Sequence, residues 1–147
     1  MNKKQAVKAI IFLFCLTGYH RLYAQEPLTK EAIAGEWLCR EVTSLPDDPE
    51  TKAAMEVMKE GFLNSRFIFK TDGIFILIFP PGSPAVLKGM DFLNNRKWYF
   101  YPDESVISIG TLKENLMQIF AKEHNGNMIF LIRDIPLALR MEKVQKP

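Results

Sequence analysis

Few residues in this chain are of the types that carry out catalytic chemistry. A predicted leader, described below, contains one of the two histidines, and the other, His124, lies in the turn sequence HNGN, where a side chain points into solvent. A hydrolytic nucleophile usually needs a base that a third group holds in place. The sequence therefore predicts no nucleophilic catalysis.

The carboxylates give no stronger indication of an active site. Asp103 and Glu104 are adjacent in YPDES, a stretch typical of a turn between two strands. One histidine, one cysteine and scattered carboxylates do not have the spacing of metal ligands, and the glycines form no phosphate-binding loop. We expect a protein that is not an enzyme and that has neither a metal site nor a cofactor.

The first 24 residues have the features of a secretory signal peptide. Three lysines precede the apolar run Ala9–Leu16, and a polar exit ends at Ala24. We expect cleavage after Ala24 and a periplasmic or secreted domain over residues 25–147. The apolar run is far shorter than the roughly 20 residues that span a bilayer, and no later run approaches that length. We therefore expect no transmembrane segment after cleavage.

The leader also accounts for the basic charge of the chain. Residues 1–24 hold four of the 19 basic residues, which leaves 15 against 17 acidic residues and a net charge of −2. This balance argues against a nucleic-acid partner, and Arg96 and Lys97 beside Trp98 are more simply a solvated strand edge. Cys39 is then the one remaining cysteine, which excludes an intramolecular disulfide and favours a buried, unreactive thiol.

Short β-branched and aromatic runs separated by turn residues predict a mainly β domain of about eight antiparallel strands. The predicted strands are 36–43, 66–71, 74–79, 96–101, 105–110, 116–124, 128–133 and 137–144. Their order along the chain predicts an up-and-down β-barrel, with one short helix between the first two strands.

Two tight turns predict the register of the hairpins. As a two-residue turn, Asp72-Gly73 pairs Thr71 with Ile74 and places Ile76 on the core face. The core face of this hairpin would be Phe67, Phe69, Thr71, Ile74, Ile76 and Ile78.

The second turn, Asn125-Gly126, places His124 opposite Asn127. The core face of that hairpin would be Met117, Ile119, Ala121, Met128, Phe130 and Ile132.

A helix is predicted over residues 49–62. Asp48 suits the N-cap, Pro49 the first helical position and Gly61 the C-terminus, while apolar residues recur at helical spacing. This helix either plugs one end of the barrel or forms a mobile lid. The prolines and glycines of residues 80–95 predict an irregular segment.

Three stretches together resemble a known family. They are Gly35-Glu36-Trp37, the run from Phe67 to Gly73, and the tryptophan-bearing strand RKWYFYPD. In a secreted chain of this length, residues 33–144 resemble the bacterial lipocalin-like domains, which are calycin-type barrels.

The resemblance implies that Gly35 allows a close bend and that Trp37 packs across one end of the barrel. It also implies an arginine over the indole, a place that Arg140 matches by position. Alternation along the last strand instead turns Arg140 outward, because Leu137, Leu139 and Met141 form the inward set.

The intracellular fatty-acid-binding proteins are the nearest rival calycins. Their carboxylate site ends in Arg-x-Tyr, whereas this chain has Arg140-Met141-Glu142. A second negative charge would repel a fatty acid, so their headgroup chemistry does not transfer.

Two functions remain open. In the first, the barrel interior binds a small hydrophobic or amphiphilic ligand. Its candidate lining residues are Phe67, Phe69, Ile76, Trp98, Phe100 and Phe130. In the second, these side chains fill the interior, and the outer surface or the 80–95 loop contacts another envelope protein. An enclosed void of at least roughly 300 Å³ favours the carrier, and a filled interior favours the interaction module.

Overall fold

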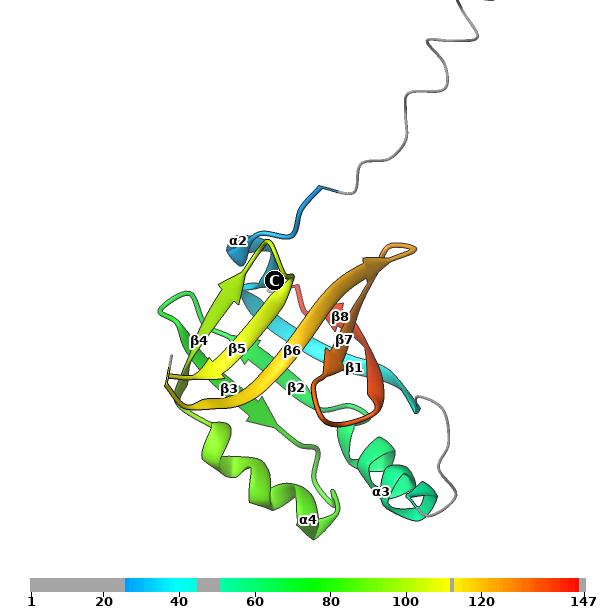
Figure 1. The fold of residues 1–147 in the computed structure, drawn as a ribbon. Coiled ribbons are helices and arrows are strands. Elements are labelled where there is room, and N and C mark those ends of the chain that lie inside the picture. Colours follow the sequence, from blue (N-terminus) through cyan, green and yellow to red (C-terminus); the bar gives the residue numbers. More distant parts are fainter. Residues whose placement is uncertain (1–25, 45–50, 112, 146–147) are drawn as a thin grey trace, which may run out of the picture.

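A computed structural model describes residues 26–44, 51–111 and 113–145. Eight antiparallel strands form a closed barrel in which each strand pairs with the next and β8 pairs with β1 (Figure 1). The strands are β1 (Gly35–Ser44), β2 (Arg66–Phe69), β3 (Ile74–Ile78), β4 (Arg96–Tyr101), β5 (Val106–Gly110), β6 (Asn115–His124), β7 (Asn127–Ile132) and β8 (Leu137–Lys143). The predicted fold is confirmed, with small shifts at the strand ends.

Short helices close the two ends of the barrel. Helix α2 (Lys30–Ile33) lies at one end, and α3 (Lys52–Phe62), α4 (Ala85–Lys88) and the 3₁₀ helix η1 (Gly89–Leu93) lie at the other (Figure 1). We call this second end the helical end.

The β6–β7 hairpin has the predicted register. Asn125 and Gly126 have φ values of 51° and 75°, as a type I′ turn requires, and His124 pairs with Asn127. The six residues predicted for its core face are all buried. They are Met117, Ile119, Ala121, Met128, Phe130 and Ile132.

The predicted register of the β2–β3 hairpin is wrong. Only Gly73 has a positive φ, at 86°, and its N–H donates to the carbonyl of Lys70, so the loop holds three residues. The Lys70 N–H in turn donates to Ile74, and the Asp72 carboxylate accepts from the N–H of Ile74 at 3.1 Å. A glycine that ends a three-residue loop in this conformation shifts the pairing by one residue from that of a two-residue turn.

This shift turns over every side chain of β3. Phe67 pairs with Leu77 and Phe69 with Phe75, and all four are buried. Ile76, predicted to face the core, instead lies on the outer face and is half-buried. A slip of one residue moves a strand's inward set to the other face because side chains alternate.

Helix α3 packs onto the barrel as a plug. Phe62 is fully buried and stacks on Phe67 with ring centroids 6.2 Å apart. The predicted cap, residues 48–50, lies outside the described residues. Gly61 does not end the helix as predicted. It lies in the last turn, and a Cβ there would come 1.7 Å from Cδ1 of Leu87.

Residues 80–95 form no strand, as predicted, but their two helical turns were not predicted. Only two residue pairs join β3 to β4. Beyond them α4 and η1 lie beside β3, and the Asn94 side-chain oxygen accepts from the N–H of Leu77 at 2.6 Å. Leu87 and Leu93 are buried in the core, so this segment closes the seam that β4 leaves open.

Candidate functional site

Aromatic rings fill the barrel interior. Phe69 lies at the centre of the cluster, with ring centroids 5.1 Å from Phe75, 5.3 Å from Trp98 and 5.9 Å from Phe130. Phe67 lies 6.0 Å from Phe130. These separations are those of rings in direct contact, so side chains occupy the space between the strands.

The structure brings together four of the six predicted lining residues. Phe67, Phe69, Trp98 and Phe130 are fully or almost fully buried in one cluster. Phe100 is partly buried and packs against that cluster. Ile76 lies outside, for the reason given above, and contact of any of the six with a ligand stays a prediction.

Sequence reasoning missed Phe75 and Leu77, which take the inward places expected of β3's isoleucines. The error came from Thr71, which was assigned to the strand. Thr71 belongs to the loop, and placing it there gives the observed pairing of Phe69 with Phe75.

Trp37 packs across the end of the barrel at which α2 lies, opposite the helical end, as the resemblance implies. It is 5% exposed and its ring centroid lies 5.8 Å from that of Phe130. Its indole N–H donates to the carbonyl of Ile33 at 2.7 Å, which ties α2 to the barrel. The bend before it occurs at Gly35, where φ is 128°.

Arg140 does not lie over Trp37, contrary to the role implied by the resemblance. It faces outward and forms an ion pair with Glu41 at 2.9 Å. Lys143 takes the expected place, with Nζ 5.2 Å from the indole centroid, and donates to the carbonyl of Ala32 at 2.7 Å. Burial lowers the pKa of this ammonium. The cation on the ring is thus a lysine two residues beyond Met141, in the inward set of β8.

The residues whose side chains could take part in catalysis lie far apart in the sequence and on different elements. His124 is exposed at its hairpin tip and contacts Asn125, while Asp103 and Glu104 are exposed in the turn between β4 and β5. Cys39 is fully buried, and burial raises the pKa of its thiol to about 11. These side chains lie on different elements and form no catalytic group.

Within residues 26–44, 51–111 and 113–145, no group of three or more histidine, cysteine or acidic side chains is placed to hold a metal ion. In the same ranges, no helix has both the length and the apolar character needed to cross a membrane.

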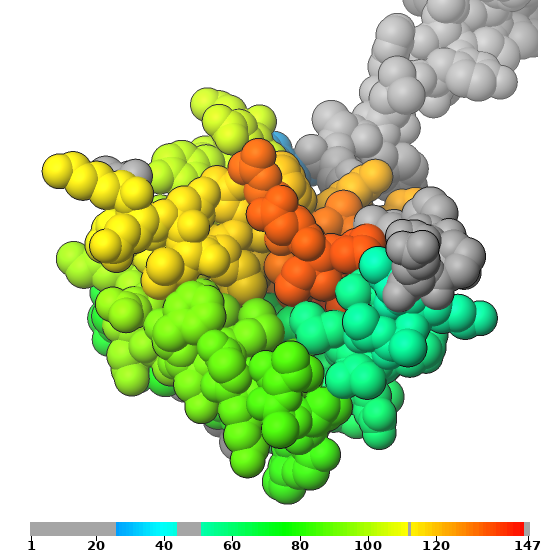
Figure 2. Space-filling model, turned by 60° about the horizontal axis from the view of Figure 1, so that its bottom comes forward, coloured from blue at the N-terminus to red at the C-terminus, as the bar shows by residue number. Residues whose placement is uncertain are grey.

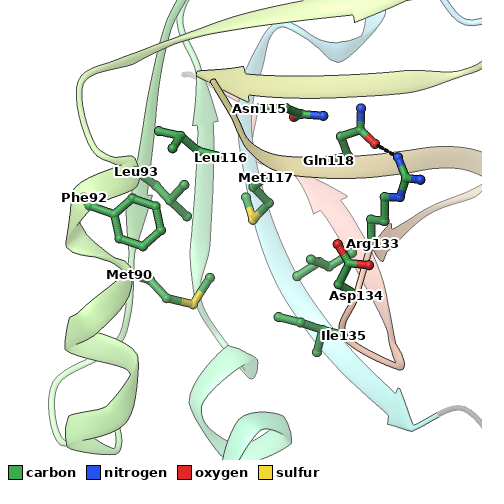
Figure 3. A pocket seen from close by; sticks show the side chains of 11 residues that line it. Met90, Phe92, Leu93, Asn115, Leu116, Met117, Gln118, Arg133, Asp134 and Ile135 are labelled. Carbon is green, nitrogen blue, oxygen red and sulfur yellow. Dashed lines mark hydrogen bonds between the residues drawn. The ribbon is translucent and has the colours of Figure 1, made fainter. Parts of the chain in front are cut away.

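A hollow of about 410 Å³ opens at the helical end, between η1, the start of β6 and the turn from β7 to β8 (Figure 3). We call it the end hollow. Its lining residues are Met90, Phe92, Leu93, Asn115, Leu116, Met117, Gln118, Ile132, Arg133, Asp134 and Ile135. None was a predicted site residue, although the three-residue spacing of Leu87, Met90 and Leu93 indicated a helical face.

The end hollow has an apolar side and a polar side. Phe92 on η1 is 50% exposed, and Met90 and Ile135 are partly buried. Across from them, the Arg133 guanidinium donates to the side-chain oxygen of Gln118, and its backbone N–H donates to the Gln118 carbonyl at 2.9 Å. These two bonds hold the Arg133 side chain at the rim.

More apolar side chains are exposed around the end hollow. Viewed from this end, α3 and α4 lie next to each other, bordered by the start of β6 and the β7–β8 turn (Figure 2). Val57 and Leu63 on or next to α3, Ile78 on β3 and Val86 on α4 are all at least 39% exposed. The helical end therefore carries most of the large apolar side chains that the described residues expose.

Comparison with known proteins shows no family for this chain. No protein-family model and no curated protein matches the sequence. The chain is similar to the solved structure of a DUF4847 family protein from Bacteroides vulgatus, with 10% sequence identity and a TM-score of 0.41. The match covers 78% of this chain and 95% of the other.

Taken together, the described residues provide a filled barrel with a polar-edged hollow at an apolar end, and a second hollow of about 460 Å³ lies at the same end beside α4 and η1. This arrangement can receive a large apolar group and pair charges at its edge. Among the described residues, His124, Cys39 and the Asp103–Glu104 pair lie on separate elements.

Proposed function

We propose that this chain is a secreted, non-catalytic, lipocalin-like interaction module of the bacterial envelope, which binds a protein partner at the end hollow. The observation that carries the proposal is the filled interior. Phe69, Phe75, Trp98 and Phe130 occupy the space that a carrier leaves for its ligand. Eight-stranded barrels lie at the size where side chains can either fill the interior or leave room for a small molecule.

The end hollow has the composition of a protein contact. Exposed aromatic side chains surrounded by polar groups commonly provide most of the binding energy at interfaces. Phe92 supplies such an aromatic, and Arg133 and Asp134 supply charges of opposite sign. Neither charge has an ion-pair partner among the described residues. A partner segment with one large apolar side chain between an acidic and a basic residue would fit this surface.

The proposed location outside the cytoplasm depends on the predicted signal peptide. Residues 1–24 resemble a signal peptide that ends at Ala24, and the charge of −2 that remains argues against a nucleic-acid partner. An envelope protein is therefore the partner class that agrees with both features.

One observation favours a second candidate, a small anionic amphiphile bound in the same hollow. The hollow measures about 410 Å³, within the roughly 300–1,000 Å³ of small-molecule sites, and Arg133 would meet the headgroup. Asp134 beside it opposes an anion, which is why we rank this candidate second.

Photo-crosslinking in intact cells tests the proposal. We would replace Phe92 with benzoylphenylalanine, and use the same replacement of Val86 as control, because Val86 is 64% exposed and does not line the end hollow. We expect one envelope protein to be crosslinked from position 92 and not from position 86. The same products from both positions, or none from position 92, would contradict the proposal. A small mass that co-purifies in native mass spectrometry would support the second candidate instead.

A further inference from the structure

The outer wall of the barrel carries a row of apolar side chains that does not include Phe92 of the end hollow. The strand registers place five outward side chains directly opposite one another, from β4 to β8. They are Tyr101, Val106, Phe120, Leu131 and Ala138. Tyr101 and Phe120 are 39% and 40% exposed. A row of this kind on the outside of a barrel indicates a surface that another molecule covers.

A groove runs beside the Phe120 side chain. Val106 and Ser108 point outward from β5, yet they are only 3% and 8% exposed, because taller side chains on β4 and β6 stand on both sides. A hollow of about 220 Å³ lies above them, lined also by Tyr101, Glu104, Thr111, Asn115 and Gln118. Tyr101 and Val106 make one side of this groove apolar, and the other lining residues are polar. The wall therefore has an aromatic ridge next to a groove whose apolar side can contact an aromatic ring.

The two ends of this groove differ in charge. Asp103 and Glu104 lie at the turn from β4 to β5, while Lys97 near the start of β4 and Arg133 just after β7 lie toward the opposite end. All four are exposed, and none forms an ion pair within the described residues. Exposed charges of the other sign are Lys122 near the first end, and Glu114 and Asp134 near the second.

We propose that a second copy of this chain docks on the face formed by β4, β5 and β6, which lie next to each other in Figure 1. A two-fold axis between ridge and groove places Phe120 of each copy in the groove over β5 of the other. This is the self-complementary contact that a symmetric dimer requires. The same axis reverses the strands, so the acidic end of one copy meets the basic end of its partner.

This inference does not depend on the proposed function. Asn115 and Gln118 line both hollows, and Arg133 takes part in both sites. The residues that decide each contact differ: the dimer needs Phe120 and the floor of β5, whereas the partner site needs Phe92 at the helical end. Either can fail without the other.

Sedimentation equilibrium of the chain without its predicted leader, residues 25–147, tests the dimer. We expect a dissociation constant between about 10 μM and about 1 mM, because the interface is small. Phe120→Asp should raise the dissociation constant by more than about tenfold, since it places a charge in the groove. Val86→Asp is the matched control and should leave the dissociation constant unchanged, because Val86 is 64% exposed and lines neither hollow. A monomer at every concentration, or equal association of Phe120→Asp and the native chain, would overturn the proposal.

A charge exchange tests the orientation of the two copies. Lys97→Glu and Glu104→Lys should each weaken the dimer, because each places like charges across the contact. The double variant should restore it, as the charges are again opposite. Far-UV circular dichroism checks that each variant is folded. If the double variant associates more weakly than both single variants, the antiparallel arrangement is wrong.

Discussion

Cys39 shows how burial controls the chemistry of one residue. Its thiol lies in the core and points at the carbonyl of Glu41, with Sγ 3.5 Å from that oxygen. Burial raises its pKa from 9.0 to about 11, so the unreactive thiol form predominates below that pH.

We therefore predict that iodoacetamide at pH 8 does not label the folded protein at an appreciable rate. Labelling should become complete in concentrated urea, where the thiol meets solvent and regains its ordinary pKa. Mass spectrometry of the intact chain measures both rates. Rapid labelling without denaturant would show that Cys39 is accessible and would contradict its place in the core.

The tryptophan end shows what residue-level reasoning reached and where it stopped. Gly35 and Trp37 have the places that the Gly-x-Trp pattern implies. The cation over the ring was assigned to Arg140, although the alternation of β8 pointed that side chain outward. Following the same alternation two residues beyond Met141 leads to Lys143, which pairs with Trp37 across the strands. The sequence thus contained the correct cation.

At the scale of elements, the strands were predictable and one register was not. Asn125-Gly126 adopts two positive φ values and allows one pairing, whereas Asp72-Gly73 supplied only one such residue and joined a longer loop. Hydrophobicity did not decide between the two registers of β3, because both of its faces are apolar. The helical turns of segment 80–95 were missed for another reason. Its prolines and glycines indicated irregular structure, and the turns also depend on packing against β3 and α3.

A substitution at Gly61 tests how closely α3 packs against α4. An alanine would favour an isolated helix by about 1 kcal/mol, but here its Cβ would overlap Cδ1 of the buried Leu87 at 1.7 Å. We expect Gly61→Ala to lower the free energy of unfolding by about 1–3 kcal/mol.

Urea unfolding followed by circular dichroism measures this change. Gly89→Ala is the control, because a Cβ there meets no atom within 4 Å, and it should be neutral or slightly stabilising. Adding Leu87→Ala to Gly61→Ala should cost less than the sum of the two single changes, since it removes the overlap. Additive losses would show that α3 and α4 do not touch at this point.

For the whole molecule, the sequence predicted the barrel and its closure but could not predict whether the interior is empty. That property depends on how the rings of separate strands meet. The register of β3 put Phe75 inside, where it lies 5.1 Å from Phe69. The interior is therefore more aromatic than the predicted lining set.

Calorimetric titration with benzene tests the filled interior most directly. Phe69 contacts three other rings, so Phe69→Ala should leave a dry cavity that binds one benzene, while the native chain should show no saturable binding. Stoichiometric binding to the native chain, with a change in tryptophan fluorescence from the buried Trp98, would mean that the interior already holds room for a ligand, and the account of a filled barrel would be wrong.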